Sequence, residues 1–206
     1  MPRLSEIRKR VAEYRPQLKP REGMRCASVA LVLTGPEDDP RIVFIERARR
    51  EGDPWSGQMA FPGGRVDPED SSERVTAERE TQEEVGLELV EAAYLGRIDD
   101  QEGRPKSPSG GIVISAHVYE FSTARDLFIN EEVQEAFWFP LAGLVDPDRH
   151  VAYRHPGVES MEFPGIALGE TPGRHVVWGL TYRFLEIFLE IVGDPMPSRW
   201  SDLEKL

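Results

Sequence analysis

The spacing of apolar residues along the chain predicts three helices. Residues 3–15 have apolar positions three or four residues apart and stop before a proline, as expected for an amphipathic helix. Residues 72–85 precede Gly86, and glycine often supplies the left-handed conformation that ends a helix. Residues 178–192 carry a broad apolar face and are followed by two prolines, which cannot continue a helix.

Runs of apolar and β-branched residues predict the strands. They are expected at residues 26–33, 41–46, 89–97, 111–121 and 135–139, with shorter candidates at 150–154 and 160–163. The first two runs are separated by a turn rich in Gly, Pro and Asp, which predicts a hairpin. Because strands and helices alternate along the chain, the expected fold class is α/β, with a mixed sheet and helices packed against it.

Length and composition limit the classes of protein to consider. The chain has 206 residues, 39% of them hydrophobic, which fits one compact domain. We expect a helical extension over residues 1–24, a domain over 25–192 and a tail over 193–206. The single cysteine excludes an internal disulfide framework, and no apolar run reaches the length of a membrane span. No secretory signal is visible, so a cytoplasmic location is expected.

Charge is distributed unevenly, and this changes the interpretation of the acidic composition. The formal net charge is −12, although residues 1–25 carry +5 and residues 67–88 alone carry −7. An acidic surface is unfavourable for nucleic-acid polymers, whose phosphates attract basic surfaces. The concentration of acid in one segment therefore points to a local site.

Three glutamates within the acidic segment share one face of the predicted helix. Glu80, Glu83 and Glu84 are spaced i, i+3 and i+4, so their carboxylates repel one another unless a cation lies between them. Hard divalent cations such as Mg²⁺ prefer oxygen ligands of this kind. The alternative is an acidic face exposed to solvent. Arg79 is expected to hold the preceding loop on the helix through Asp70. The Asp70–Glu73 stretch resembles a helix N-terminal cap to which the Glu73 side chain returns.

The acidic segment resembles the signature of the Nudix hydrolase family. That signature contains a glycine, then a glutamate, then the run R-E-U-x-E-E-x-G-U, where U is a bulky apolar residue. Here residues 79–87 read Arg-Glu-Thr-Gln-Glu-Glu-Val-Gly-Leu, and Gly64 opens the segment. Two positions differ, because Thr81 replaces a bulky aliphatic residue and Asp70 replaces the first glutamate, one residue further from Arg79.

Further stretches resemble the coenzyme A pyrophosphatase branch of this family. Residues 57–70 read Gly-Gln-Met-Ala-Phe-Pro-Gly-Gly-Arg-Val-Asp-Pro-Glu-Asp and precede Thr-Ala-Glu-Arg-Glu at 76–80. The run Trp-Gly-Leu-Thr at 178–181 is also similar to this branch, whereas Ala116 stands where the branch often has a proline in a strand. That strand is a candidate for one wall of the substrate pocket.

The resemblance implies a fold, a metal site and a reaction. The implied fold is an α/β/α sandwich with a mixed sheet, in which the signature forms a loop–helix–loop. Glu80, Glu84 and Glu83 would hold Mg²⁺ or Mn²⁺, with the carbonyl of Gly64 as a further ligand. The general base is left open between a helix glutamate, such as Glu83, and a loop carboxylate, for which Glu132 is preferred over Glu131.

Outside the signature, several residues are candidates for contact with substrate. Arg47 ends the second predicted strand and is suited to forked phosphate contacts, and Trp55 could stack on a base or pack against the protein. The expected partner is a small nucleotide-containing substrate rather than a nucleic-acid polymer or a membrane. Residues 1–24 and 146–175 are left as extensions that either cap the pocket or form a homodimer contact.

These observations predict a metal-dependent pyrophosphohydrolase. The first hypothesis is hydrolysis of coenzyme A or its derivatives to 3′,5′-ADP and 4′-phosphopantetheine. The second keeps the reaction but takes ADP-ribose, NADH, an NDP-sugar or a nucleoside triphosphate as substrate. The third is a non-catalytic ligand sensor with the same fold, which the presence of all three glutamates disfavours.

Overall fold

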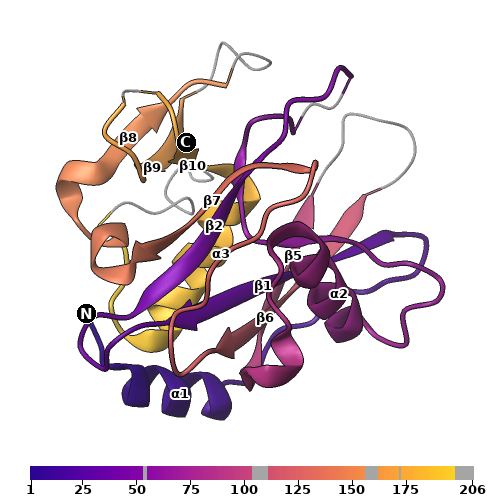
Figure 1. The fold of residues 1–206 in the computed structure, drawn as a ribbon, viewed down its shortest axis with the longest axis horizontal. Helices are drawn as coiled ribbons and strands as arrows, with labels where there is room; N and C mark the ends of the chain where they lie inside the picture. The colour runs from indigo at the N-terminus through magenta and orange to yellow at the C-terminus, as the bar shows by residue number, and fades with distance from the viewer. Residues whose placement is uncertain (53–54, 104–110, 156–161, 172, 198–206) are drawn as a thin grey trace.

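A computed structural model of the chain describes residues 1–52, 55–103, 111–155, 162–171 and 173–197, and Figure 1 shows its arrangement. The helices are α1 (Leu4–Glu13), α2 (Glu73–Val85) and α3 (Gly179–Val192). The main sheet contains β1 (Arg25–Thr34), β2 (Arg41–Arg47), β3 (Met59–Ala60), β4 (Gly63–Arg65), β5 (Ala93–Gly103), β6 (Ile112–Glu120) and β7 (Val133–Pro140). A smaller sheet contains β8 (His150–Tyr153), β9 (Phe163–Ala167) and β10 (Val176–Val177).

The main sheet is mixed, as the sequence predicted. Its strands are ordered β3-β2-β1-β6-β5, while β4 pairs with β1 and β7 pairs with β2. Strands β1 and β6 are parallel neighbours, and the other described pairs are antiparallel. The smaller sheet is antiparallel, in the order β10-β9-β8.

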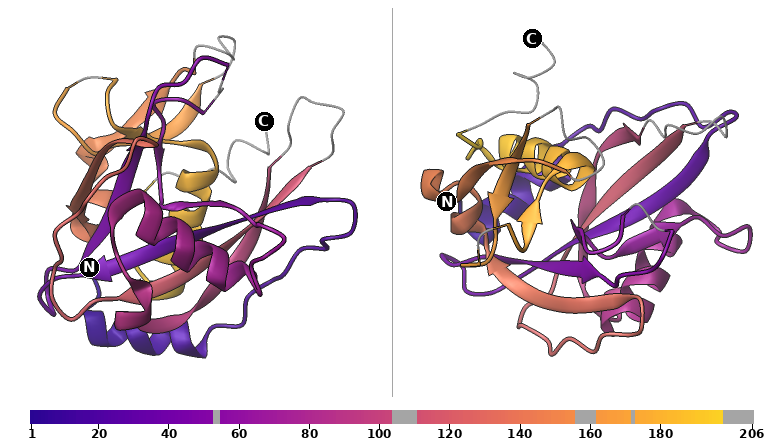
Figure 2. Two further views of the ribbon diagram at one scale, coloured as in Figure 1. Left: turned by 45° about the vertical axis from the view of Figure 1, so that its right-hand side comes forward. Right: turned by 90° about the horizontal axis from the view of Figure 1, so that it is seen from above.

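Helices cover both faces of the main sheet, which gives the expected α/β/α layers (Figure 2). One core cluster joins α1 and α3 to the sheet, and it includes Leu4 and Phe188, which are buried. The other cluster lies beneath α2, where Ala77 and Val85 pack against Tyr119. The glutamate-bearing helix is therefore held by one apolar edge, which leaves its remaining surface available for polar chemistry.

The predicted hairpin forms only at its corner. Strands β1 and β2 are paired at Leu33–Ile42 and Thr34–Arg41, after which β2 diverges and pairs along its length with β7. Beyond this corner, the neighbour of β1 is β4 instead of β2, and β4 pairs with residues 27–29 of β1. This divergence brings the loop that opens the acidic segment onto the central strand.

The strand predicted over residues 89–97 is wrong at its start. Leu89–Glu91 form a 3₁₀ turn, and the strand begins at Ala93. Leu89 is 2% exposed and packs into the core beneath α2, so the chain turns inward before it extends. Residues 160 and 161 of the candidate strand at 160–163 lie outside the described residues, and β9 begins at Phe163. Residues 198–206 of the predicted tail also lie outside them.

The segment that follows α1 is tied to the sheet by a buried ionic network. The side chain of Asp100 is fully buried, and its two oxygens accept hydrogen bonds from Arg21 at 2.7 Å and Arg97 at 2.6 Å. The backbone N–H of Lys19 donates to the same carboxylate at 2.8 Å. Glu73, the first residue of α2, contacts both arginines at 2.7 Å. The N-terminal extension, β5 and the start of α2 therefore meet at one group of charges.

Among the described residues, no helix combines the length and the apolar character needed to cross a membrane.

Candidate metal and substrate site

Two glycines bring the loop before α2 against the central strand. At Gly63, φ is +151° and a Cβ atom would lie 2.3 Å from the Ser28 carbonyl oxygen, so a side chain cannot be accommodated. At Gly64, a Cβ atom would lie 2.3–2.4 Å from the carboxylate atoms of Glu80. Gly64 also pairs with Ser28 of β1. The absence of side chains at these positions therefore lets the helix carboxylates approach the backbone.

Glu84 is the most deeply buried of the three helix glutamates. It is 1% exposed, and its Oε2 accepts a hydrogen bond of 2.8 Å from the backbone N–H of Gly63. Burial raises the pKa of Glu84 to about 8, although the Gly63 N–H and the charge of Arg47 act in the opposite direction. The neighbouring carboxylates of Glu80 and Glu132 raise this pKa further. The Gly63 N–H and the charge of Arg47 therefore do not offset the cost of ionising Glu84 in its buried position.

Arg79 connects the entry loop to the other two glutamates, which confirms its predicted contact with Asp70. Its guanidinium donates to both oxygens of Asp70, at 3.1 and 2.9 Å, and holds the pKa of that carboxyl well below its usual range. The same guanidinium donates to Glu80 at 2.9 Å and to Glu83 at 3.2 Å. Arg79 therefore orients two carboxylates and fixes the loop, which is a positioning role.

The N-terminal cap of α2 differs in detail from the prediction. Ser72 is the cap, and its hydroxyl accepts from the backbone N–H of Val75 at 3.3 Å. Asp70 is engaged by Arg79 and also accepts from the Thr76 hydroxyl at 2.8 Å. Glu73 does not fold back onto the cap, because it contacts the arginines beside β5.

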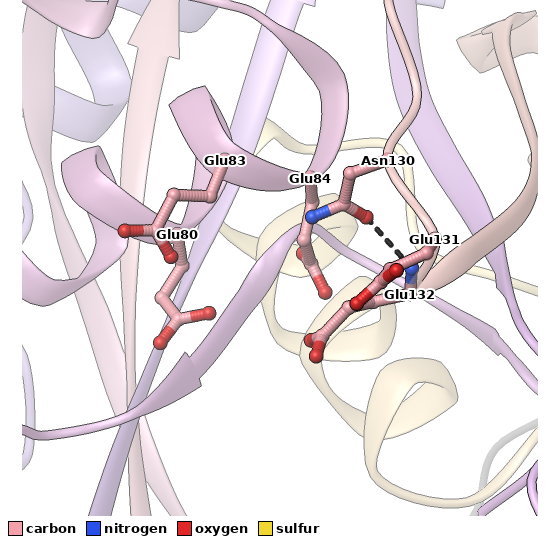
Figure 3. Close-up of a pocket in the computed structure, with 6 residues that line it drawn as sticks. All are labelled: Glu80, Glu83, Glu84, Asn130, Glu131 and Glu132. Carbon is pink, nitrogen blue, oxygen red and sulfur yellow. Dashed lines mark hydrogen bonds between the residues drawn. The ribbon is translucent and has the colours of Figure 1, made fainter.

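A loop before β7 supplies carboxylates from the opposite side of a cavity. This cavity has a volume of about 460 Å³ and is lined by Glu80, Glu83, Glu84, Asn130, Glu131 and Glu132. In Figure 3, Glu80 and Glu84 extend from α2 toward the space that Glu131 and Glu132 border from the other side. The Asn130 side-chain oxygen accepts from the Glu132 backbone N–H at 2.9 Å, and Arg50 lies 3.1 Å from the Glu132 carboxylate.

The residues that line this cavity suit a hard divalent cation. All the acidic ones offer carboxylate oxygens, which Mg²⁺ and Mn²⁺ prefer over nitrogen or sulfur. Desolvation also raises the pKa of the half-buried Glu80, although its contact with Arg79 acts in the opposite direction. A bound divalent cation would neutralise the repulsion between these carboxylates and favour the ionised forms.

The other sequence candidates take different positions. Arg47 ends β2, is half-buried, and lies close enough for its charge to act on Glu84. Trp55 is 52% exposed and borders neither of the two cavities described for this chain. Ala116, which stands at the position of the branch's proline, is fully buried in the core on the α3 side and borders neither of these two cavities.

Two features of the site were not found from the sequence. Asn130 positions the Glu132 backbone, and an asparagine two residues before a carboxylate at a strand start is a recognisable turn signal. A second group of potential ligand atoms, within 4.8 Å of one another, comes from Glu46, Glu135 and His175. Arg174 donates to Glu135 at 2.8 Å and lies 3.5 Å from Glu46, so a protein cation already contacts both of those carboxylates.

Substitution of Gly64 by alanine tests the close approach of Glu80 to the loop. The new methyl group would take the place of the Glu80 carboxylate, whose side chain can move at little cost to folding. We expect the affinity for Mn²⁺ to fall about 10- to 100-fold while the melting temperature of the metal-free protein changes little. Titration calorimetry and thermal melting measure the two quantities.

The neighbouring Gly63→Ala variant provides a contrast for this test. Its methyl group would meet backbone atoms of residues 28 and 29 at 2.3–2.6 Å, and these cannot move independently of the strand. We expect that variant to lose stability as well as metal affinity. If Gly64→Ala bound Mn²⁺ as tightly as the wild type, the close contact would have no role in placing Glu80.

Comparison with known protein families finds a domain match that includes α2 and the loop before β7. A model of the NUDIX domain matches residues 24–159. Among solved structures, that of a MutT/nudix family protein from Enterococcus faecalis superposes with a TM-score of 0.51 at 19% identity. The match covers 88% of this chain and 71% of that one, and it supports the likeness of fold.

Curated relatives extend the likeness beyond the domain. The mitochondrial coenzyme A diphosphatase NUDT8 of Mus musculus is 30% identical over 170 residues, which cover 81% of this chain and 78% of that protein. An uncharacterized protein of Schizosaccharomyces pombe is 33% identical over 161 residues. That match covers 67% of this chain, which thus spans about half (48%) of the length of the yeast protein.

Proposed function

The chain belongs to the Nudix family of hydrolases acting on diphosphate bonds, and from this premise we propose that it hydrolyses coenzyme A or its derivatives. The observation that carries the proposal is the convergence of the α2 glutamates and Glu132 on one acidic cavity. The likeness to NUDT8 supports coenzyme A as the substrate. The stretches at 57–70 and 178–181 that resemble the coenzyme A branch support it as well.

The proposed reaction adds one water molecule across the diphosphate. A P–O bond of the diphosphate bridge breaks, the water oxygen joins one phosphorus, and the products are 3′,5′-ADP and 4′-phosphopantetheine. Bound Mg²⁺ or Mn²⁺, held by Glu80, Glu83, Glu84 and the Gly64 carbonyl, would supply charge neutralisation and a lower pKa for water. Loose phosphoryl-type transition states depend mainly on such positioning and charge neutralisation.

The protein's own groups have separate parts in this proposal. Arg79 holds Glu80 and Glu83 in place through its contacts at 2.9 and 3.2 Å. Glu132 lies across the cavity from the helix and is assigned as the group that accepts the proton of the attacking water. The contact with Arg50 and the Asn130 turn hold Glu132 at the rim. Arg47, beside Glu84, is assigned to the substrate phosphates.

A substrate panel tests this proposal. Purified protein is incubated with Mg²⁺ or Mn²⁺ and with coenzyme A, an acyl-coenzyme A, NADH, ADP-ribose or a deoxynucleoside triphosphate. We expect coenzyme A to give the highest kcat/KM, with both products identified by liquid chromatography and mass spectrometry. Turnover of ADP-ribose or a triphosphate with coenzyme A untouched would show that the proposed substrate is wrong.

A further inference from the structure

A second cavity lies beside the smaller sheet, next to the segment that follows β2. Its volume is about 250 Å³, and its lining includes Glu46, Gln58, Tyr153, Arg174, His175 and Trp178. These residues come from the end of β2, the loop before β3, strand β8 and the segment around β10. Figure 1 shows the smaller sheet beside the loop that leaves β2. The residues left unassigned at 146–175 therefore supply part of its wall.

One short segment, residues 46–50, contributes side chains to both cavities. Glu46 borders the second cavity, whereas the charge of the next residue, Arg47, acts on Glu84 in the acidic site. Arg49 also borders the second cavity, and its neighbour Arg50 contacts Glu132 at 3.1 Å. Successive residues of 46–50 thus face different cavities. This segment therefore links the lining of the second cavity to the carboxylates of the acidic one.

The second cavity combines aromatic and hydrogen-bonding side chains. The rings of Tyr153 and Trp178 have centroids 5.1 Å apart, and His155 stacks on Trp178 at 4.7 Å. The Gln58 side-chain amide carries both donor and acceptor atoms, and its Nε2 lies 3.4 Å from Nε2 of His155. The lining residues Arg174 and His175 both contact the carboxylates of Glu46 and Glu135, so these polar side chains hold one another in place. The lining thus joins two aromatic side chains to a larger number of polar ones, and both kinds of group bind planar heteroaromatic rings that carry hydrogen-bonding atoms.

The Trp-Gly-Leu-Thr run at 178–181 connects this cavity to the entry loop of the acidic site. Trp178 borders the cavity, and Gly179 begins α3 with a left-handed φ of +64°. Three residues after Trp178, the Thr181 hydroxyl donates to the backbone carbonyl of Met59 at 3.3 Å. Met59 begins the stretch that leads to Gly63. The run therefore fixes the position of the aromatic wall relative to the loop that carries the acidic site.

We propose that the second cavity binds the nucleobase of the substrate while its diphosphate lies at the α2 glutamates. This inference rests on the proposed function, because it needs a substrate that joins a base to a diphosphate. Tyr153 and Trp178 provide the aromatic wall, and Gln58 provides hydrogen bonds to the edge of the base. The cavity is thus a specificity site for nucleotides over diphosphates that lack a base.

The Tyr153→Leu variant tests the proposal, with Phe163→Leu as a matched control. Both rings are half-buried and pack on Trp178, at 5.1 and 5.3 Å, but Tyr153 borders the cavity and Phe163 does not. We expect Tyr153→Leu to raise the KM for the hydrolysed nucleotide about 5- to 100-fold with little change in kcat. Phe163→Leu should keep the wild-type KM, and thermal melting shows whether each variant is folded.

A binding experiment separates this inference from the identity of the substrate. Saturation-transfer NMR with 3′,5′-ADP and metal-free protein should show transfer to the adenine protons for the wild type and Phe163→Leu. The transfer should weaken for Tyr153→Leu, and ribose 5-phosphate should show none. This result would hold even if coenzyme A were not hydrolysed. Equal transfer in the two variants, or none with the wild type, would overturn the base site whether or not coenzyme A is cleaved.

Discussion

Glu84→Gln will lower kcat by at least roughly 10²–10³-fold, with no loss of folding. Charge stabilisation by a bound metal contributes several kcal/mol to the transition state, and each 1.4 kcal/mol corresponds to a factor of about ten in rate. Glu84 is the most deeply buried carboxylate of the cavity, so its charge is the least screened by solvent. A glutamine has the same shape and still accepts the Gly63 N–H. It cannot supply the negative charge.

Stability measurements separate loss of charge from loss of structure in this variant. Burial raises the pKa of Glu84 to about 8, so the metal-free wild type contains an acid that is costly to ionise at neutral pH. The metal-free glutamine variant should therefore melt at the same temperature as the wild type or higher. Addition of Mn²⁺ should raise the melting temperature of the wild type, because a ligand that binds only the folded state stabilises it. The variant should show a much smaller rise.

Two further substitutions complete this experiment. Glu78 lies on the same helix but bonds to Arg74 and to the Tyr119 hydroxyl, away from the cavity, so Glu78→Gln should retain wild-type kcat. Glu132→Gln should lower kcat while retaining most of the Mn²⁺-induced stabilisation, since its proposed role is to accept a proton. Wild-type turnover by Glu84→Gln would contradict the assignment of the metal site.

The acidic face of α2 could be predicted from the sequence because its information is local. Glu80, Glu83 and Glu84 share a helix face through spacing alone, and the ends of α2 are marked by Ser72 and Gly86. The Arg79–Asp70 contact also spans only nine residues. In each case the backbone geometry of one helix and its entry loop determines which side chains meet.

The second cavity could not be predicted because its parts are distant in sequence. Gln58, Tyr153 and Trp178 meet only after β2 leaves β1 and the smaller sheet packs beside it. β2 diverges where β4 pairs with β1 in its place. The apolar pattern of the first two strands predicts a hairpin and carries no sign of this third strand. The turn at Leu89 was missed for a similar reason, since burial beneath α2 overrides the strand preference of residues 89–92.

The buried network around Asp100 predicts a large loss of stability from a single polar substitution. Asp100→Asn removes the negative charge between Arg21 and Arg97, which lie 79 and 3 residues away in sequence. Removal of one partner from a buried ion pair costs about 3–5 kcal/mol, and Glu73 still contacts both arginines, so we expect about 3 kcal/mol. For a chain of this length, that corresponds to a fall of about 6–12 °C in melting temperature.

The adjacent Asp99 offers a matched control, because it accepts from the neutral Tyr14 hydroxyl and the Gln17 N–H. Asp99→Asn should therefore lower the free energy of unfolding by only about 1 kcal/mol.

Burial acts to raise the pKa of Asp100, but the hydrogen bonds from Arg21, Arg97 and the Lys19 N–H outweigh it, so this pKa is lowered. A lowered pKa means that the carboxylate stabilises the fold above about pH 4 and loses this effect as pH falls further. Urea unfolding of wild type and Asp100→Asn should accordingly differ most at neutral pH and converge in acid. A difference that stayed constant down to pH 3 would show that the loss comes from altered packing rather than from the missing charge.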